Sequence, residues 1–189
     1  MITILVGKSC SGKDTIKKEL LSRGMNSIVT HTTRSRRNGE EDGIAYHFIS
    51  VTDFFEKELN GYFAETTSYE TVHGRWYYGT SIESLKNAPD NTVIILNPDG
   101  LRAVQKIEGL DIVSFYIKAK KSVIKKRLKS RGDNRNEAKR RMREDKKDFK
   151  DMDFEVDYTI DNNGNNSIEE LADIIQFHVN RRKGEKNTK

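Results

Sequence analysis

The first twenty-two residues constrain the fold more than any other segment of the chain. Residues 2–6 form a short, mainly apolar run, Gly7 and Gly12 bracket a turn rich in small residues, and Lys13 follows directly. Across residues 15–22 three apolar side chains are spaced for one face of a helix. The segment therefore predicts a buried strand, a tight turn and a helix, in that order.

The spacing G-x-x-x-x-G-K between a strand and a helix indicates a phosphate-binding loop, or P-loop. Glycines let backbone N–H groups turn inward around a phosphate, the start of the helix adds partial positive charge, and the lysine supplies a mobile cation. We expect this loop to bind ATP. The predicted ATP-binding residues are Gly7, Lys8, Ser9, Cys10, Ser11, Gly12, Lys13, Asp14 and Thr15.

Two residues of this loop carry separate expectations. Asp14 stands where the simple consensus has Ser or Thr, and the hydroxyl arrives one residue later, in Thr15. Because a carboxylate aimed at the triphosphate would repel it, we expect Asp14 to face away or to hold a Mg²⁺-bound water. Cys10 is either a reactive thiol activated by the start of the helix or simply a small residue that fits the loop.

Alternating apolar runs and helical patterns along the rest of the chain predict an α/β fold with a parallel sheet flanked by helices. Between them, residues 46–78 are rich in aromatic and β-branched residues and are interrupted by glycines, which predicts a small mixed β insertion. The predicted strands are 2–6, 93–96, 112–117 and 157–160, and the predicted helices are 15–22, 101–107, 122–128 and 167–179.

Composition excludes several classes of protein. The single cysteine excludes an internal disulfide and a cysteine-based zinc site. No apolar stretch is long enough to span a bilayer and no signal peptide opens the chain, so a cytoplasmic location and no membrane partner are expected. The net charge of +5 fits nucleic acid, an anionic membrane or a phosphorylated small molecule equally well.

A second motif covers residues 30–48 and reads T-H-T-T-R-S-R-R-N-G-E-E-D-G-I-A-Y-H-F. Arg34 and Arg37 can grip a dianionic phosphate with planar forks of donors, and Tyr46 can add a hydroxyl. Glu40 can orient one of the arginines. The alternative interpretation is a solvated charged loop, to which the regular spacing of Arg, Gly and Tyr runs counter.

The spaced pattern T-T-R-x-x-R-x-G-E-x-x-G-x-x-Y-x-F closely resembles the GMP-phosphate-binding segment of guanylate kinases, at the right distance after a P-loop. The resemblance continues through residues 62–65 and 76–80, which look like the base-recognition strands of that family, and it covers nearly the whole chain. It implies a P-loop nucleoside monophosphate kinase that moves the γ-phosphoryl group of ATP to GMP or dGMP, with Mg²⁺ as cofactor.

The resemblance also implies individual roles. Carried over by position, Glu65 would accept hydrogen bonds from guanine N1–H and the 2-amino group, Thr30 and Thr80 would bond the base edge, and Tyr78 would touch the phosphate. The implied GMP-binding set is Thr30, Arg34, Arg37, Glu40, Tyr46, Glu65, Tyr78, Thr80 and Asp99.

Asp99 resembles the family aspartate near the base and the metal. Asn97, however, stands where the family usually has a second carboxylate, and the following loop looks about two residues shorter. We therefore expect no direct metal ligand from the protein, with Mg²⁺ carried mainly by ATP and water.

Residues 127–132 followed by 137–142 resemble the lid of these kinases, in which arginines close over the phosphates. Such closure neutralises charge on the transferred group and excludes water. Arg140 or Arg135 could take the place given to Arg141. The predicted catalytic residues are Lys13, Arg34, Arg131 and Arg141.

The predicted organisation is a single domain, 1–182, with a core (1–32, 80–128 and 150–182), an NMP-binding subdomain (33–79), a lid (129–149) and a disordered basic tail (183–189). The predicted partners are ATP and GMP, without nucleic acid; the oligomeric state is left open. Two alternatives keep the fold: another acceptor, such as a different NMP or ribose 1,5-bisphosphate, or an inactive binding module.

Overall fold

The computed structural model describes residues 1–71, 74–130 and 135–187. The chain divides into two compact units. The first comprises residues 1–26, 90–98 and 111–189, and the second comprises residues 27–89 and 99–110. The second unit is thus larger than the NMP-binding subdomain predicted at 33–79, because residues 80–89 and 99–110 pack with it rather than with the core.

The described residues of the first unit form a five-stranded sheet in the order β2 (Asn26–Ser27), β7 (Thr92–Ile95), β1 (Ile2–Val6), β8 (Ile112–Lys118) and β9 (Tyr158–Asp161). β1 runs parallel to both β7 and β8, and β8 runs parallel to β9. β1 lies at the centre, and all five of its residues are buried. Its C-terminal end leads directly into the glycine-rich loop, as the apolar run at 2–6 predicted.

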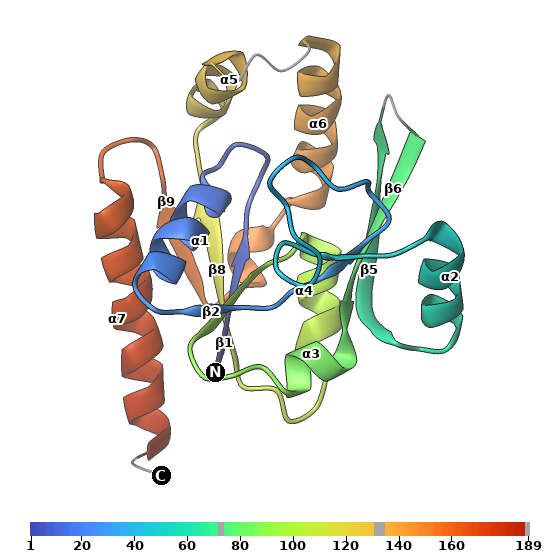
Figure 1. Cartoon of the computed structure of the whole chain (residues 1–189). Coiled ribbons are helices and arrows are strands. Elements are labelled where there is room, and N and C mark those ends of the chain that lie inside the picture. The colour runs from blue at the N-terminus through green and yellow to red at the C-terminus, as the bar shows by residue number, and fades with distance from the viewer. Residues whose placement is uncertain (72–73, 131–134, 188–189) are drawn as a thin grey trace. The chain divides into compact units, whose positions relative to one another are not determined.

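The helices of the first unit are α1 (Lys13–Ser22), α5 (Lys121–Ser130), α6 (Arg135–Asp148) and α7 (Ile168–Asn187), with a 3₁₀ turn, η1, at Met152–Phe154. Figure 1 shows α1 and α7 side by side. Their apolar faces close the core, where Ile16 and Leu20 of α1 meet Leu171 of α7 and Phe115 of β8. The predicted α/β fold with a parallel sheet is confirmed.

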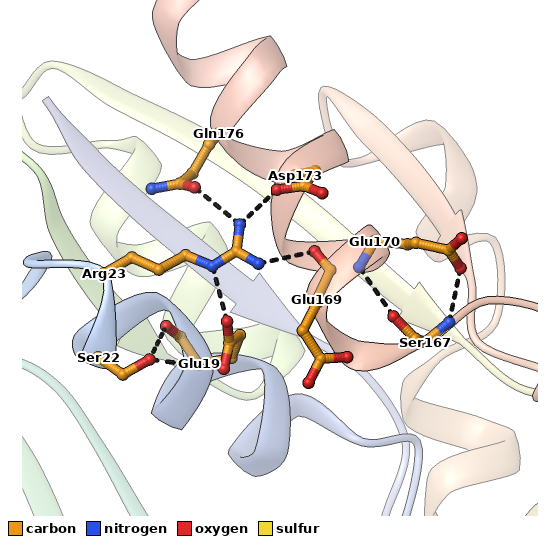
Figure 2. Close-up of polar contacts among 8 residues, drawn as sticks. All are labelled: Glu19, Ser22, Arg23, Ser167, Glu169, Glu170, Asp173 and Gln176. Carbon is orange, nitrogen blue, oxygen red and sulfur yellow. Dashed lines mark hydrogen bonds and ion pairs between the residues drawn. The ribbon is translucent and has the colours of Figure 1, made fainter.

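A polar clasp around Arg23 fixes α1 against α7 (Figure 2). The Arg23 Nε atom donates to Glu19, at 2.7 Å, within the last turn of α1. One terminal nitrogen donates to Asp173 and Gln176 of α7, at 2.5 and 3.0 Å, and the other donates to the Glu169 carbonyl at 3.0 Å. A planar guanidinium can make all of these bonds at once, so the clasp sets the orientation of the helix that begins at the phosphate loop.

The predicted disordered tail at 183–189 is wrong for residues 183–187, because α7 continues to Asn187. The apolar spacing that predicted the helix ends near Val179, but the last turns are held by polar contacts instead. Arg182 pairs with Asp157, the Lys183 ammonium donates to the Asn91 side chain at 2.5 Å, and Arg181 pairs with Glu185 four residues on.

The second unit holds a four-stranded sheet in the order β4 (His47–Phe48), β3 (His31–Thr32), β6 (Gly74–Ser81) and β5 (Phe63–Thr71) among the described residues. β3 runs parallel to β4 and antiparallel to β6, and β5 and β6 form an antiparallel hairpin (Figure 1). This is the predicted mixed β insertion.

The helices of the second unit are α2 (Val51–Leu59), α3 (Ile82–Lys86) and α4, which is Pro98–Gln105 and belongs to this unit except for its first residue. Phe54 of α2 stacks on Phe63 and packs on Tyr77, with ring centroids 4.7 and 5.5 Å apart. Gly79 is required beneath this cluster, since a β-carbon there would lie 2.8 Å from the Phe63 ring. In the described part of the chain, every helix is too short or too polar to cross a bilayer.

Candidate functional site

The glycine-rich loop of the first unit has the backbone of an anion cradle. Gly12 caps α1 in the left-handed region, at φ 106°, and no side chain caps the first N–H groups of that helix. A β-carbon on Gly12 would lie 2.2 Å from the Asn162 amide nitrogen, and one on Gly7 would lie 2.6 Å from the Ile117 carbonyl oxygen. Both glycines are therefore required, and backbone N–H groups at the start of a helix such as α1 are suited to bind an anion.

The Lys13 side chain points back toward the first residues of this loop. Its Nζ atom donates to the carbonyl oxygens of Gly7 and Lys8, at 2.5 and 3.1 Å, so the ammonium lies at the mouth of the turn. Asp14 and Thr15 are exposed in the first turn of α1. Cys10 is half-buried and forms no disulfide, and its backbone adopts a left-handed φ of 59°. The contacts of these loop residues with ATP remain predictions.

Arg127 and Asn162, to which the sequence analysis assigned no role, donate hydrogen bonds to carbonyl oxygens of the loop. Arg127 of α5 donates to the carbonyl oxygens of Cys10 and Ser11, at 3.2 and 3.0 Å, and also to the carbonyl and side-chain oxygens of Asn162. The Asn162 side chain, itself buried, donates to the Ser11 carbonyl at 2.8 Å. These bonds fix the Cys10 and Ser11 carbonyls on Arg127 and Asn162 and so hold the backbone of the loop in one conformation.

A carboxylate also reaches the loop from α6. The Ser9 N–H donates to Asp145 Oδ2 at 3.0 Å, across 136 residues of sequence. Burial raises the pKa of Asp145, against the opposing effect of Ser9, Lys13 and Lys8, which favour the ionised form. No local sequence signal points to this contact.

The structure describes the side chains of only some of the predicted lid arginines. Arg131 lies outside the described residues, as does the side chain of Arg135. Arg141 is half-buried on α6, and the neighbouring Arg140 pairs with Glu144, at 2.6 Å. Which arginine contacts the transferred phosphate therefore stays a prediction.

In the second unit, Arg34 is held in one orientation by Glu40. Two guanidinium nitrogens of Arg34 donate to the two carboxylate oxygens of Glu40, at 2.9 and 2.8 Å. The pair fixes the guanidinium plane, and the hydrogen bonds from Arg34 lower the pKa of Glu40 to about 2. Arg34 is only 4% exposed, and Glu40 also accepts from the Arg37 backbone N–H at 2.8 Å.

Aromatic hydroxyl-bearing rings surround this arginine. The Arg34 guanidinium lies 5.3 Å from the Tyr46 ring centroid, and the Tyr46 and Tyr78 rings meet edge to face with centroids 5.9 Å apart. The Arg37 side chain is exposed. The structure therefore brings Arg34, Glu40, Tyr46 and Tyr78 together, and positions Arg37 beside them through its backbone. Such a cluster suits the dianionic phosphate of a small molecule.

A half-buried carboxylate lies further along the same sheet. The hairpin register shifts between Phe63 and Glu65, so that Glu65 opposes Thr80. This bulge re-aims the carboxylate, and Glu65 Oε1 accepts from the Thr80 hydroxyl at 2.6 Å. Burial raises the pKa of Glu65, and the hydrogen bonds from Thr80 partly offset that effect. Glu65 Oε2 is an acceptor suited to a neutral N–H donor.

Thr30 directly precedes β3, which pairs with β6 so that His31 opposes Gly79. The contact of Thr30 with the base stays a prediction. His31 itself is buried, and its pKa is lowered to about 4 by burial and by His47 and Lys57, so it is a neutral structural residue. Asp99 is 87% exposed and pairs with Arg102, at 2.7 Å, within α4.

Among the described residues, no group of three or more His, Cys, Asp or Glu side chains is arranged to hold a metal ion. A hard cation such as Mg²⁺ needs no such group when it binds through substrate phosphates, because it keeps several waters and takes only one or two protein oxygens. The exposed Asp14 and Thr15 at the start of α1 fit that second kind of site.

Comparison with known proteins gives a consistent result. The family model described as guanylate kinase matches residues 1–178. A guanylate kinase of Campylobacter jejuni strain RM1221 is 33% identical, over 97% of this chain and 92% of the relative. One of Syntrophus aciditrophicus is 30% identical, over 94% of this chain and 86% of the relative. The crystal structure of guanylate kinase from Anaplasma phagocytophilum shares the fold, with a TM-score of 0.68, 24% identity and coverage of 96% and 85% of the two chains.

Proposed function

Because the chain belongs to the guanylate kinase family, we propose that it is an enzyme that transfers the γ-phosphoryl group of ATP to GMP, giving ADP and GDP. The observation that carries the choice of acceptor lies within the second unit. One sheet holds an oriented arginine beside two tyrosines, together with a half-buried carboxylate that is free to accept from N–H donors. A guanine nucleotide offers both a phosphate for the arginine and the N1–H and 2-amino donors of its base for the carboxylate.

The donor nucleotide is bound by the first unit. The amides at the start of α1 and the Lys13 ammonium hold the β- and γ-phosphates, while Arg127 and Asn162 keep the loop in its binding conformation. Mg²⁺, when bound with ATP, neutralises charge on the phosphates. Asp14 and Thr15 are exposed at the start of α1, and Asp14 would hold a water bound to that ion rather than the ion itself.

The acceptor nucleotide is bound by the second unit. Arg34, fixed by Glu40, binds the GMP phosphate as a fork, and Arg37, Tyr46 and Tyr78 add donors to the same group. Glu65 accepts from guanine N1–H and the 2-amino group, with Thr30 and Thr80 on the base edge. The proposed GMP-binding set also includes Asp99, whose exposed carboxylate pairs with Arg102.

The chemistry needs no general base, because an already ionised phosphate oxygen is the nucleophile. Catalysis is mainly positioning and charge stabilisation. Lys13 and Arg34 hold the two phosphates, and Arg131 and Arg141 of the lid segment meet charge that develops on the transferred group. The cytoplasmic location and the choice between GMP and dGMP stay predictions.

A coupled ADP-release assay with Mg²⁺ across GMP, dGMP, AMP, UMP, TMP and ribose 1,5-bisphosphate tests this function. We expect activity with GMP and dGMP, and its loss in Lys13→Ala, with the exposed Lys18→Ala as a matched control on the same helix. Activity with ribose 1,5-bisphosphate or another NMP in place of GMP would show that the acceptor is not GMP. No ADP release with any acceptor would leave the inactive binding module as the better account.

A further inference from the structure

Asp145 of α6 touches the phosphate loop, and the proposed reaction gives this contact no role. Its Oδ2 atom accepts the Ser9 N–H at 3.0 Å. Its neighbours Glu144 and Lys146 are exposed, whereas Asp145 is half-buried. The contact joins the lid helix to a backbone donor inside the loop that binds an anion.

The surroundings of this carboxylate are those that a phosphate oxygen would meet. Lys8 and Lys13 both act on it electrostatically in the direction that favours its negative charge. Its hydrogen-bond donor is a backbone amide of the glycine-rich loop, the type of group that cradles phosphates. The Asp145 carboxylate therefore accepts the Ser9 hydrogen bond that a small anionic ligand would accept.

A nucleotide phosphate and the Asp145 carboxylate cannot share this position. Both are acceptors for one N–H, and two like charges in contact repel each other strongly in a partly desolvated site. Asp145 has to leave the loop when the triphosphate enters. Because Asp145 is part of α6, its release removes a contact between the phosphate loop and the helix that carries Arg140 and Arg141.

We propose that Asp145 is an internal competitor of ATP, a latch that docks the lid helix on the phosphate loop until the nucleotide phosphates displace it. The latch rests on the proposed function, because it assumes that the loop binds ATP. It couples nucleotide entry to a change in the position of the lid arginines.

The latch has a thermodynamic consequence that can be measured. A ligand that binds only the released state has an apparent Kd equal to its intrinsic Kd divided by the released fraction. The Asp145 contact is a hydrogen bond to a charged group, and removing it should tighten nucleotide binding by about tenfold. A merely structural contact predicts unchanged or weaker binding.

The experiment is isothermal titration of ADP with Mg²⁺ into four full-length proteins: wild type, Asp145→Ala, Asp145→Asn and Asp148→Asn. Asp148 is an exposed carboxylate on the same helix, so its variant removes an equal charge at a site away from the contact. We expect the tightest binding in Asp145→Ala and intermediate binding in Asp145→Asn, because the amide oxygen can still accept from Ser9. The Kd of Asp148→Asn should match wild type.

The outcomes separate the two proposals. Wild type that binds ADP, with Asp145 variants that bind it no more tightly, overturns the latch alone. Wild type that binds no ADP contradicts the proposed function itself. Thermal melting of each variant shows that it is folded, and the near-isosteric Asp145→Asn decides the question if Asp145→Ala does not fold.

Discussion

Glu65→Gln tests whether the half-buried carboxylate selects guanine. In the structure, Glu65 Oε1 is committed to the Thr80 hydroxyl at 2.6 Å, which leaves Oε2 for the guanine donors. In the variant, the amide oxygen is expected to keep the Thr80 bond, because the hydroxyl is a donor. The amide NH₂ then faces guanine N1–H and the 2-amino group, and because all three groups are donors no hydrogen bond can form between them.

The expected loss follows from this geometry. A hydrogen bond to a charged group contributes about 1.5–3 kcal/mol, and a donor left unpaired in a buried site costs about 1–3 kcal/mol more. A total of about 2.5–6 kcal/mol corresponds to a factor of about 10² to 10⁴ in kcat/KM for GMP. AMP offers no such donor pair, so its much lower kcat/KM should change little and the GMP to AMP ratio should collapse.

The assay is ADP release at subsaturating GMP or AMP, with a thermal melt as the control for folding. Because burial raises the pKa of Glu65, the carboxylate is less stable in the folded state than in water, and the neutral glutamine should leave Tm unchanged or raise it. An unchanged GMP to AMP ratio in a folded variant would refute the assignment of guanine selectivity to Glu65.

Three further predictions concern the same unit. Arg34→Lys keeps the charge but loses the two-pronged bond to Glu40, and we expect KM for GMP to rise about tenfold or more with KM for ATP unchanged; equal changes in both would contradict the assignment. Gly79→Ala places a β-carbon 2.8 Å from the Phe63 ring and should lower the free energy of unfolding by about 1–3 kcal/mol in urea unfolding. Gly184→Ala is the control, because Gly184 is a helical residue of α7 and a β-carbon there meets no atom within 4 Å, so this variant should unfold at the same or a higher urea concentration. The pKa of Glu65 lies above its usual value, so kcat/KM for GMP should fall as pH decreases through that raised pKa; a profile that stays flat down to the ordinary glutamate range would speak against it.

The parts of the site that depend on short-range pattern could be predicted from the sequence. The run at 2–6, the turn with Gly7 and Gly12, and the following helix appear where expected, because a buried strand and a helix start each leave a local signature. The pairing of Arg34 with Glu40 also follows from a local motif, because the two residues are only six positions apart.

Contacts between distant segments could not be predicted in the same way. Asp145 meets Ser9 across 136 residues, and Asn162 meets Ser11 across 151, so neither pair has a local pattern. The bulge that sets Glu65 opposite Thr80 depends on hairpin register, which composition does not specify. The final turns of α7 were missed because polar contacts rather than apolar spacing hold them.

The most direct test of the account is a ³¹P NMR time course of the purified protein with ATP, GMP and Mg²⁺. The account predicts that the ATP γ signal and the GMP signal fall together while ADP and GDP rise in equal amounts. ATP that persists unchanged, or that yields ADP and inorganic phosphate without GDP, would contradict it.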